Sequence, residues 1–249
     1  MLLHGFTGSH FVWERLCDNL EDEYFIVLPD LPGHGNSAGV SDMNVDQTSD
    51  AILSLLDDLK LEKVALLGYS LGGRIALNFA TRYEERLVGL ILESASPGIL
   101  DMKEREKRRL EDKALAEDAR RYGLSWFLEE WENRDLFASQ KSLPEDERQR
   151  VRNERLVNTA AGLANSLEHA GAGAMLPMWS KLGGLQMPVL LIAGEKDRKY
   201  LSIAEEMKER TSNCILKIIE NAGHTTHLEN YCKFNETVRE FLQVLYHKN

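Results

Sequence analysis

A serine in a glycine-rich turn is the first candidate for chemistry in this sequence of 249 residues. Ser70 is the central residue of Gly68–Gly72, which fits the pattern G-x-S-x-G. The apolar residues 64–67 precede this turn, and the helix-forming residues 74–80 follow it. Strand, sharp turn and helix are typical of a nucleophile elbow, which projects the serine hydroxyl above a sheet. The alternative is a glycine-rich turn with an incidental serine.

Backbone N–H groups near Ser70 could stabilise negative charge that develops during a reaction. The N–H of Leu71 lies at a predicted helix N-terminus, where the helix dipole favours an anion. The motif His4-Gly5-Phe6 follows a predicted strand at residues 1–4. We expect that strand to end beside the elbow, so the N–H of Phe6 can join that of Leu71 in an oxyanion hole. A simple turn is the alternative for His4 and Gly5.

A serine nucleophile or base needs an imidazole, and the imidazole needs a carboxylate that fixes its tautomer. Asp197 follows a predicted strand at 188–194, and His224 follows a predicted strand at 214–219. The order Ser70, Asp197, His224 is the chain order of α/β-hydrolase triads. Each residue lies just beyond the end of a different strand, so the sequence predicts that the three side chains converge above the sheet.

Other residues could fill two of these roles. His227 lies three positions after His224 and could replace it, although we expect it to pack at the start of the last helix. Glu195 or Glu93 could supply the carboxylate, although Asp197 fits the spacing better. The remaining histidines that we weighed are expected to be ordinary surface or helical-segment residues: His10, His169 and His247.

Strands and helices alternate along most of the chain, which predicts an α/β fold with a mostly parallel, doubly wound sheet. The predicted strands are 1–4, 25–28, 64–67, 87–92, 188–194 and 214–219. Residues 99–170 differ, because charge density rises there and helical segments follow one another without strands. We expect this segment to be a lid on a core of 1–98 and 171–249. Such a lid would cover the carboxyl edge of the sheet, where ligands bind in open α/β sheets.

Composition limits the classes of function. The chain is 43% hydrophobic and 28% charged, and no apolar run is long enough to span a membrane. The first residues given show no basic and apolar signal-peptide pattern, and the three cysteines lack metal-like spacing, so we expect a cytoplasmic protein without signal peptide, metal or cofactor. The net charge of −10 argues against nucleic acid or anionic membranes as partners. An anionic small-molecule substrate remains compatible, because clustered arginines can override the global charge.

These motifs resemble the α/β-hydrolase family over nearly the whole chain. The residues that carry this resemblance are His4–Phe6, Asp30–Gly35, Gly68–Gly72, Gly194–Asp197 and Gly223-His224. A narrower group of residues resembles the MenH family within that fold. These are Gly68–Arg74, Glu93–Gly98, Trp131 with the following Leu136–Gln140, and Ala193–Asp197.

The narrower resemblance implies a carbon–oxygen lyase of menaquinone biosynthesis. Such an enzyme eliminates pyruvate from 2-succinyl-5-enolpyruvyl-6-hydroxy-3-cyclohexene-1-carboxylate and forms 2-succinyl-6-hydroxy-2,4-cyclohexadiene-1-carboxylate. By this resemblance Ser70, activated by His224, is a base rather than an acylated nucleophile, and Asp197 stabilises the imidazolium. The N–H groups of Phe6 and Leu71 would hold the enolate-like charge on the succinyl carbonyl.

This substrate carries three carboxylates, so its pocket should contain arginines, which bind carboxylates through two parallel hydrogen bonds. Arg74 lies one helical turn after Ser70 and could reach the same cavity. The resemblance adds four further substrate-binding residues: Tyr69, Arg108, Trp131 and Arg155. For Arg108 and Arg155 the alternative is a solvated helix face, because charged helices usually face water.

Two other classes of function compete with the lyase. A serine hydrolase acting on an ester, a thioester or a C–C bond would use the same triad. Arg74 favours the lyase, because a simple ester pocket gains nothing from a buried guanidinium beside the serine. A ligand receptor that has kept only the fold is the third class, and the intact triad counts against it.

The first strands of the resembled fold are expected to be missing from this sequence. The chain begins almost at His4, whereas this fold normally has two strands before that motif. Either those strands are absent from the protein or Met1 is not its true start. For the chain as given, we expect an exposed sheet edge and weaker solubility.

Overall fold

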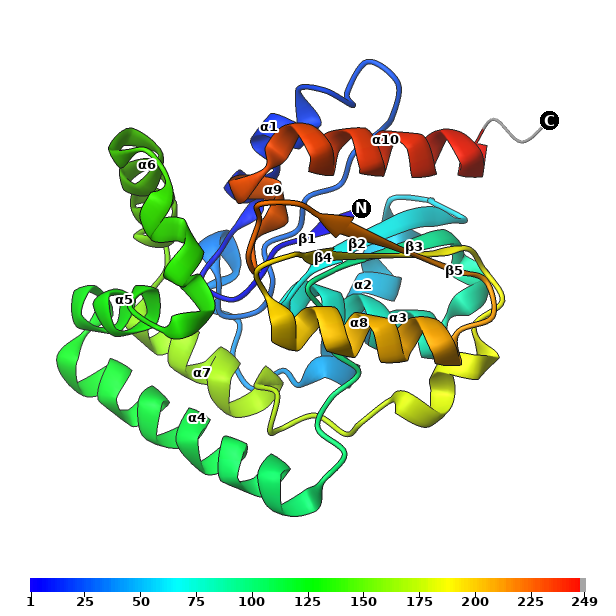
Figure 1. The fold of residues 1–249 in the computed structure, drawn as a ribbon. Helices are drawn as coiled ribbons and strands as arrows, with labels where there is room; N and C mark the ends of the chain where they lie inside the picture. Colours follow the sequence, from blue (N-terminus) through cyan, green and yellow to red (C-terminus); the bar gives the residue numbers. More distant parts are fainter. Residues whose placement is uncertain (247–249) are drawn as a thin grey trace.

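The computed structural model describes residues 1–246, in which five parallel strands form one sheet (Figure 1). The strands are β1 (Leu2–Leu3), β2 (Val64–Tyr69), β3 (Leu87–Glu93), β4 (Val189–Gly194) and β5 (Cys214–Ile219). They lie side by side in the order of the chain, and each neighbouring pair is parallel. The carboxyl ends of all five strands therefore meet at one edge. The predicted α/β class with a parallel sheet is confirmed.

Helices cover both faces of the sheet. On one face lie α2 (Val45–Asp58), α3 (Leu71–Arg82) and α8 (Arg198–Arg210), and on the other lie α1 (Glu14–Cys17) and α10 (Tyr231–Tyr246) (Figure 1). A short helix, α9 (Thr226–Glu229), follows β5. The sheet is therefore doubly wound, as predicted. None of the helices in residues 1–246 combines the length and the hydropathy that a membrane crossing needs.

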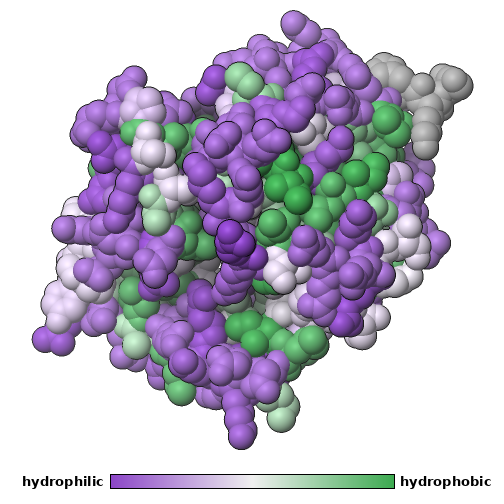
Figure 2. All heavy atoms as spheres, viewed as in Figure 1, coloured by the Kyte–Doolittle hydropathy of each residue, from purple (hydrophilic) through white to green (hydrophobic). Residues whose placement is uncertain are grey.

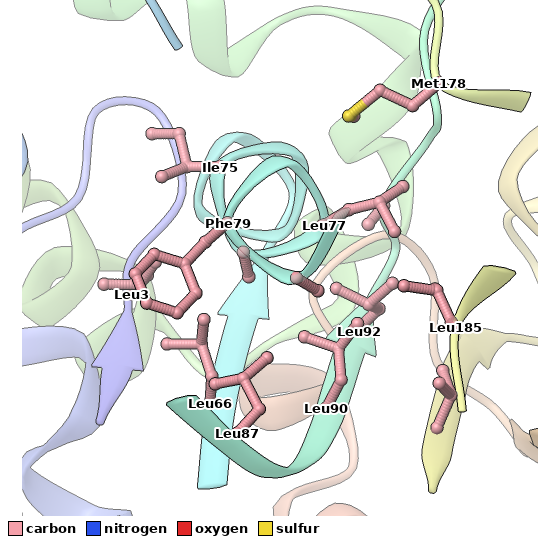
Figure 3. Packing of buried hydrophobic residues seen from close by; sticks show 14 of the residues in the cluster. Leu3, Leu66, Ile75, Leu77, Phe79, Leu87, Leu90, Leu92, Met178 and Leu185 are labelled. Atoms are coloured by element: carbon pink, nitrogen blue, oxygen red, sulfur yellow. The ribbon is translucent and has the colours of Figure 1, made fainter. Parts of the chain in front are cut away.

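Alternating side chains of each strand build two separate hydrophobic cores. Leu66 of β2 faces α3, whereas its neighbour Leu67 faces the layer of α1 and α10. The reason is that successive side chains of a strand point to opposite faces of the sheet. Figure 3 shows Phe79 of α3 directed at Leu3 and Leu66, so the elbow helix is packed against the first two strands. This packing fixes the start of α3 relative to the sheet.

Four helices between β3 and β4 form a separate layer at the edge where the strands end (Figure 1). They are α4 (Met102–Tyr122), α5 (Leu124–Glu132), α6 (Glu145–Arg155) and α7 (Ala160–Ala170), with a 3-10 segment at Asp135–Ser142. Helices α4, α5 and α7 and the 3-10 segment share a hydrophobic cluster of their own, which includes Phe127, Trp131 and Phe137, whereas α6 has no buried residue. Hydrophilic residues cover most of the molecular face in Figure 2, including much of this layer.

The predicted strand at 25–28 is wrong, because the structure assigns no strand there. Its one backbone bond to the sheet joins the N–H of Leu2 to the carbonyl oxygen of Val27, at 3.0 Å. The neighbouring strand β1 has only two residues, which is too short for a ladder of several hydrogen bonds. Residues 25–28 therefore run beside β1 as irregular chain, and Phe25 remains 76% exposed.

Candidate active site

Ser70 occupies a strained turn between β2 and α3. Its φ of 51° and ψ of −104° are unusual for a residue with a side chain. The turn requires close backbone approach on both sides of the serine. A Cβ on Gly68 would lie 2.3 Å from the carbonyl oxygen of Gly72, and a Cβ on Gly72 would lie 2.3 Å from that of Leu3. A side chain at either glycine of G-x-S-x-G would therefore clash with the backbone. The sharp turn that the glycines permit places the serine at the carboxyl edge of the sheet.

The three predicted triad side chains lie within hydrogen-bonding distance of one another. The Nε2 atom of His224 is 3.1 Å from the Oγ of Ser70, and its Nδ1 is 2.6 Å from Oδ2 of Asp197. The second carboxylate oxygen of Asp197 accepts from the N–H of Tyr200, at 3.2 Å, and so starts helix α8. His224 is 1% exposed and Asp197 is 8% exposed. A proton on Nδ1 satisfies the carboxylate and leaves Nε2 free to accept the serine proton.

The competing acids and histidines have other contacts. His227 directs its Nδ1 at Oε2 of Glu93, 2.7 Å away, and does not face Ser70. The carboxylate of Glu195 accepts from the backbone N–H of Asn221, at 2.9 Å. The other histidines weighed from the sequence lie elsewhere: His10 beside Asp30, His169 beside Asp42, and His247 outside the described residues.

Two backbone N–H groups are available beside Ser70. Leu71 is the first residue of α3, so its N–H has no acceptor within the helix, and the N–H of Phe6 has no backbone or side-chain acceptor in residues 1–246. Buried His4 accepts from the N–H of Leu31 through Nε2, at 3.0 Å, and lies 2.8 Å from the oxygen of Gly5 through Nδ1. Burial lowers the pKa of His4 to about 4, so the ring is neutral and Nδ1 carries the proton. This contact fixes the peptide that presents the Phe6 N–H.

A cavity of about 410 Å³ lies over the serine, between the sheet edge and the helical layer. Its lining combines the predicted reaction centre with aromatic and cationic side chains. Among the lining residues are Phe6, Tyr69, Ser70, Leu71, Arg74, Arg108, Trp131, Arg134, Asp197 and Lys199. No group of three or more His, Cys, Asp or Glu side chains within residues 1–246 is arranged to hold a metal ion.

Arg74 places a largely buried charge in this cavity. Its guanidinium donates to the carbonyl oxygen of Ala170, at 2.8 Å, and contacts the sulfur of Met175. Within residues 1–246 it has no carboxylate within ion-pair distance. Burial lowers the pKa of Arg74 to about 10, so the group still carries its charge at neutral pH. An anion in the cavity would supply the missing partner.

The two arginines expected from the helical layer differ in position. Arg108 lines the cavity, and its Nε donates to the buried Asp112, at 2.8 Å. Arg155 does not line this cavity. Its guanidinium lies 3.0 Å from Glu132, and it lines a neighbouring cavity together with Phe6 and Tyr69. Arg108 therefore shares the cavity of Ser70, whereas Arg155 lines the neighbouring cavity.

Two further cationic residues that line the cavity were not identified from the sequence. The guanidinium of Arg134 lies 4.5 Å from the centre of the Trp131 ring, and burial lowers its pKa. Lys199 lies two positions after Asp197, in the first turn of α8. Arg134 lies three positions after Trp131, and Lys199 lies two positions after Asp197. This closeness to predicted site residues is the signal from which both could have been predicted.

The chain matches the α/β hydrolase fold family over residues 1–231. A protein of Klebsiella pneumoniae named 2-succinyl-6-hydroxy-2,4-cyclohexadiene-1-carboxylate synthase is 34% identical over 230 residues, which cover 92% of this chain and 88% of that one. A protein of Bacillus subtilis, named provisionally as the same synthase, is 43% identical over 244 residues, which cover 96% of this chain and 88% of that one.

Solved structures agree with these relatives. The structure of MenH from S. aureus aligns with a TM-score of 0.92 and 33% identity, and the alignment covers 98% of this chain and 92% of that one. A thermophilic esterase from Thermogutta terrifontis aligns with a TM-score of 0.80 and 27% identity, covering 98% and 89%. The chain therefore belongs to the α/β hydrolase fold family and, within it, to the family of 2-succinyl-6-hydroxy-2,4-cyclohexadiene-1-carboxylate synthases.

Proposed function

We propose that this protein is a carbon–oxygen lyase of menaquinone biosynthesis. It eliminates pyruvate from 2-succinyl-5-enolpyruvyl-6-hydroxy-3-cyclohexene-1-carboxylate and leaves 2-succinyl-6-hydroxy-2,4-cyclohexadiene-1-carboxylate. The observation that carries this proposal is the buried charge of Arg74, which lines the same cavity as Ser70 and has no carboxylate partner in residues 1–246. A cavity with such a charge suits an anionic substrate better than a neutral ester.

The reaction begins with removal of a proton from the carbon that activates the elimination. The Oγ of Ser70 takes this proton while its own proton passes to Nε2 of His224, 3.1 Å away. The electrons of the broken C–H bond delocalise onto the succinyl carbonyl oxygen, which accepts from the N–H groups of Phe6 and Leu71. The electrons then form the second ring double bond as the C–O bond to the enolpyruvyl group breaks, and the departing enolate takes the proton held by His224 and becomes pyruvate. Asp197 stabilises the imidazolium of His224 throughout.

Four cationic side chains line the cavity and could pair with the three carboxylates of this substrate. Arg74 and Lys199 belong to helices of the sheet layer, whereas Arg108 and Arg134 belong to the helical layer. The chain as a whole carries a net charge of −10, so this cluster creates a local field of the opposite sign. Such a field would draw a trianion into the cavity and orient it over Ser70.

Residues 99–170 form the lid of this enzyme in our proposal, over a core of 1–98 and 171–249. Phe6 of the oxyanion loop packs against Trp131 of this segment, with ring centres 4.8 Å apart. The lid would exclude water from the developing charge, which strengthens each electrostatic contact. Tyr69 and Trp131 would line the substrate, and we place the enzyme in the cytoplasm, where no disulfide is needed.

A paired assay tests the function. Purified protein should release pyruvate from the menaquinone precursor, detected through lactate dehydrogenase, and should turn over p-nitrophenyl esters poorly. The Ser70→Ala variant controls for contaminating activity in both arms. A serine hydrolase is the second candidate, because the esterase at 27% identity shares the fold. Brisk ester turnover without pyruvate release would establish the hydrolase instead.

A further inference from the structure

Glu93, the last residue of β3, is the most deeply buried carboxylate beside the triad, with 0% of its surface exposed. Its carboxylate accepts three hydrogen bonds from two consecutive residues. Oε1 accepts from the hydroxyl of Thr226, at 2.6 Å, and from the N–H of His227, at 3.0 Å. Oε2 accepts from Nδ1 of His227, at 2.7 Å. None of these contacts belongs to the reaction described above.

The backbone of the same residue contacts the serine. The carbonyl oxygen of Glu93 accepts the N–H of Ser70, at 2.9 Å. Thr226 and His227 follow His224 by two and three positions. Glu93 therefore bonds on one side to the residue that carries the hydroxyl and on the other to the segment that carries the imidazole. It joins two loops that are more than 150 positions apart in the chain.

Burial makes this arrangement specific. A carboxylate removed from water is strongly destabilising unless donors satisfy its oxygens. Here all three donors come from one short segment, so the segment has one favourable position. The rings of Trp13 and Tyr69 pack against His227, with ring centres 4.8 Å away in each case, and Glu93 itself has no exposed surface. A hydrogen bond from this segment to β2, between the hydroxyls of Tyr69 and Thr225 at 2.7 Å, supports the same position.

We propose that Glu93 is a positioning residue, which sets the distance between the Oγ of Ser70 and Nε2 of His224. Its carbonyl fixes the serine, and its carboxylate fixes the segment after the histidine. The inference rests on the proposed roles of Ser70 and His224, but not on the identity of the substrate. A displacement of about 1 Å at such a contact lowers a rate by about 10²-fold.

The test measures the reactivity of Ser70 independently of the lyase reaction. Phenylmethylsulfonyl fluoride forms an Oγ–sulfur bond with an activated serine and releases fluoride, while the serine proton passes through the histidine. Mass spectrometry of the intact protein follows this modification. The Glu93→Met variant keeps the side-chain size but removes all three acceptors. We expect modification and kcat to fall by about 10²-fold, with KM changed less than about twofold.

Milder variants keep the test decisive if Glu93→Met fails to fold. Thr226→Val removes one donor and should slow modification by about 10-fold. His227→Asn retains an N–H donor near the position of Nδ1 and should keep most of the activity, whereas His227→Leu should not. Glu220→Gln, an exposed carboxylate before the same segment, is the matched control and should behave as wild type.

Folded Glu93→Met or Thr226→Val protein with wild-type modification rates would overturn the inference. Equal losses in His227→Asn and His227→Leu would also overturn it, because only one of these variants retains a donor. If the wild type releases no pyruvate while Ser70 modification still depends on Glu93, the proposed lyase function fails and the positioning role stands.

Discussion

The sheet wall of the cavity and the helical wall differ in how their polar groups are held. On the sheet wall, Ser70, Asp197 and His224 bond to one another, and backbone carbonyls at strand ends hold Ser70 and Asp197. On the helical wall, Arg108 pairs with the buried Asp112 of its own helix, and Arg134, between two helices, lies over the ring of Trp131.

The two walls therefore have different roles in the reaction. The sheet wall is preorganised, because strained backbone and buried hydrogen bonds allow its groups few alternatives. The helical wall is more adaptable, because Arg108 and Arg134 are long, partly exposed side chains that make no hydrogen bond to the backbone of residues 1–246. We expect substitutions on the sheet wall to change kcat, and substitutions on the helical wall to change KM.

The largest effect is expected from the reacting hydroxyl. Ser70→Ala should lower kcat for pyruvate release by about 10³-fold or more, because the base is lost while the pocket remains. Steady-state kinetics with the coupled pyruvate assay measures this. A loss of less than about 10-fold would show that another group removes the proton.

Arg74 lies where the two walls meet. Arg74→Met should lower kcat/KM for the anionic precursor by about 10²-fold and spare any turnover of neutral esters. Because the variant also removes a buried charge without a carboxylate partner, its Tm should rise. Kinetics and thermal unfolding are measured on the same preparation. Loss of stability together with loss of ester turnover would assign Arg74 a structural role.

Substitution of Arg134 tests whether the helical wall contributes to substrate binding. Arg134→Gln should raise KM for the precursor by about 10-fold with little change in kcat, since it removes one charge-assisted contact. Arg134→Lys should recover part of this loss. The control is Arg148→Gln on α6, where Arg148 pairs with Glu145 and lies outside the Ser70 cavity. An equal effect of both variants would argue for a nonspecific field.

The smallest effect concerns acid stability. Burial lowers the pKa of His4 to about 4 and that of His34 to about 3, against about 6.5 for an exposed imidazole. Above pH 6.5 neither the folded nor the unfolded chain protonates them, so they do not affect stability. Between pH 6.5 and 4 only the unfolded chain gains these protons, and the free energy of unfolding falls as pH falls. Each histidine contributes at most about 1.4 kcal/mol per pH unit.

Urea unfolding at several pH values measures this slope. His34→Gln should make the slope shallower than in wild type, because one buried imidazole is removed. His169→Gln should leave it unchanged, since that histidine is partly exposed on α7 of the helical wall. Equal slopes in all three proteins would show that carboxylates alone govern acid unfolding.

The reaction centre was predictable from sequence because it depends on short motifs at strand ends. Ser70, Asp197 and His224 each follow an apolar run, and parallel strands bring their ends to one edge. The helical wall was less predictable. Arg155 and Arg134 lie on similar charged segments, and only packing decides which of the two faces the cavity. The strand expected at 25–28 failed for a related reason, since a strand forms only where a neighbour offers a ladder.

Local chemistry in the sequence determined the parallel α/β sheet, the elbow at Ser70 and the acid and histidine loops. Tertiary structure decided which acid and which histidine meet the serine, that Glu93 bonds to the segment after His224, and which cations line the cavity. The physical reason is the distance along the chain over which each kind of interaction acts. Hydrophobic periodicity and turn geometry act over a few residues, whereas the partner of a buried charge is set by residues far away in the chain.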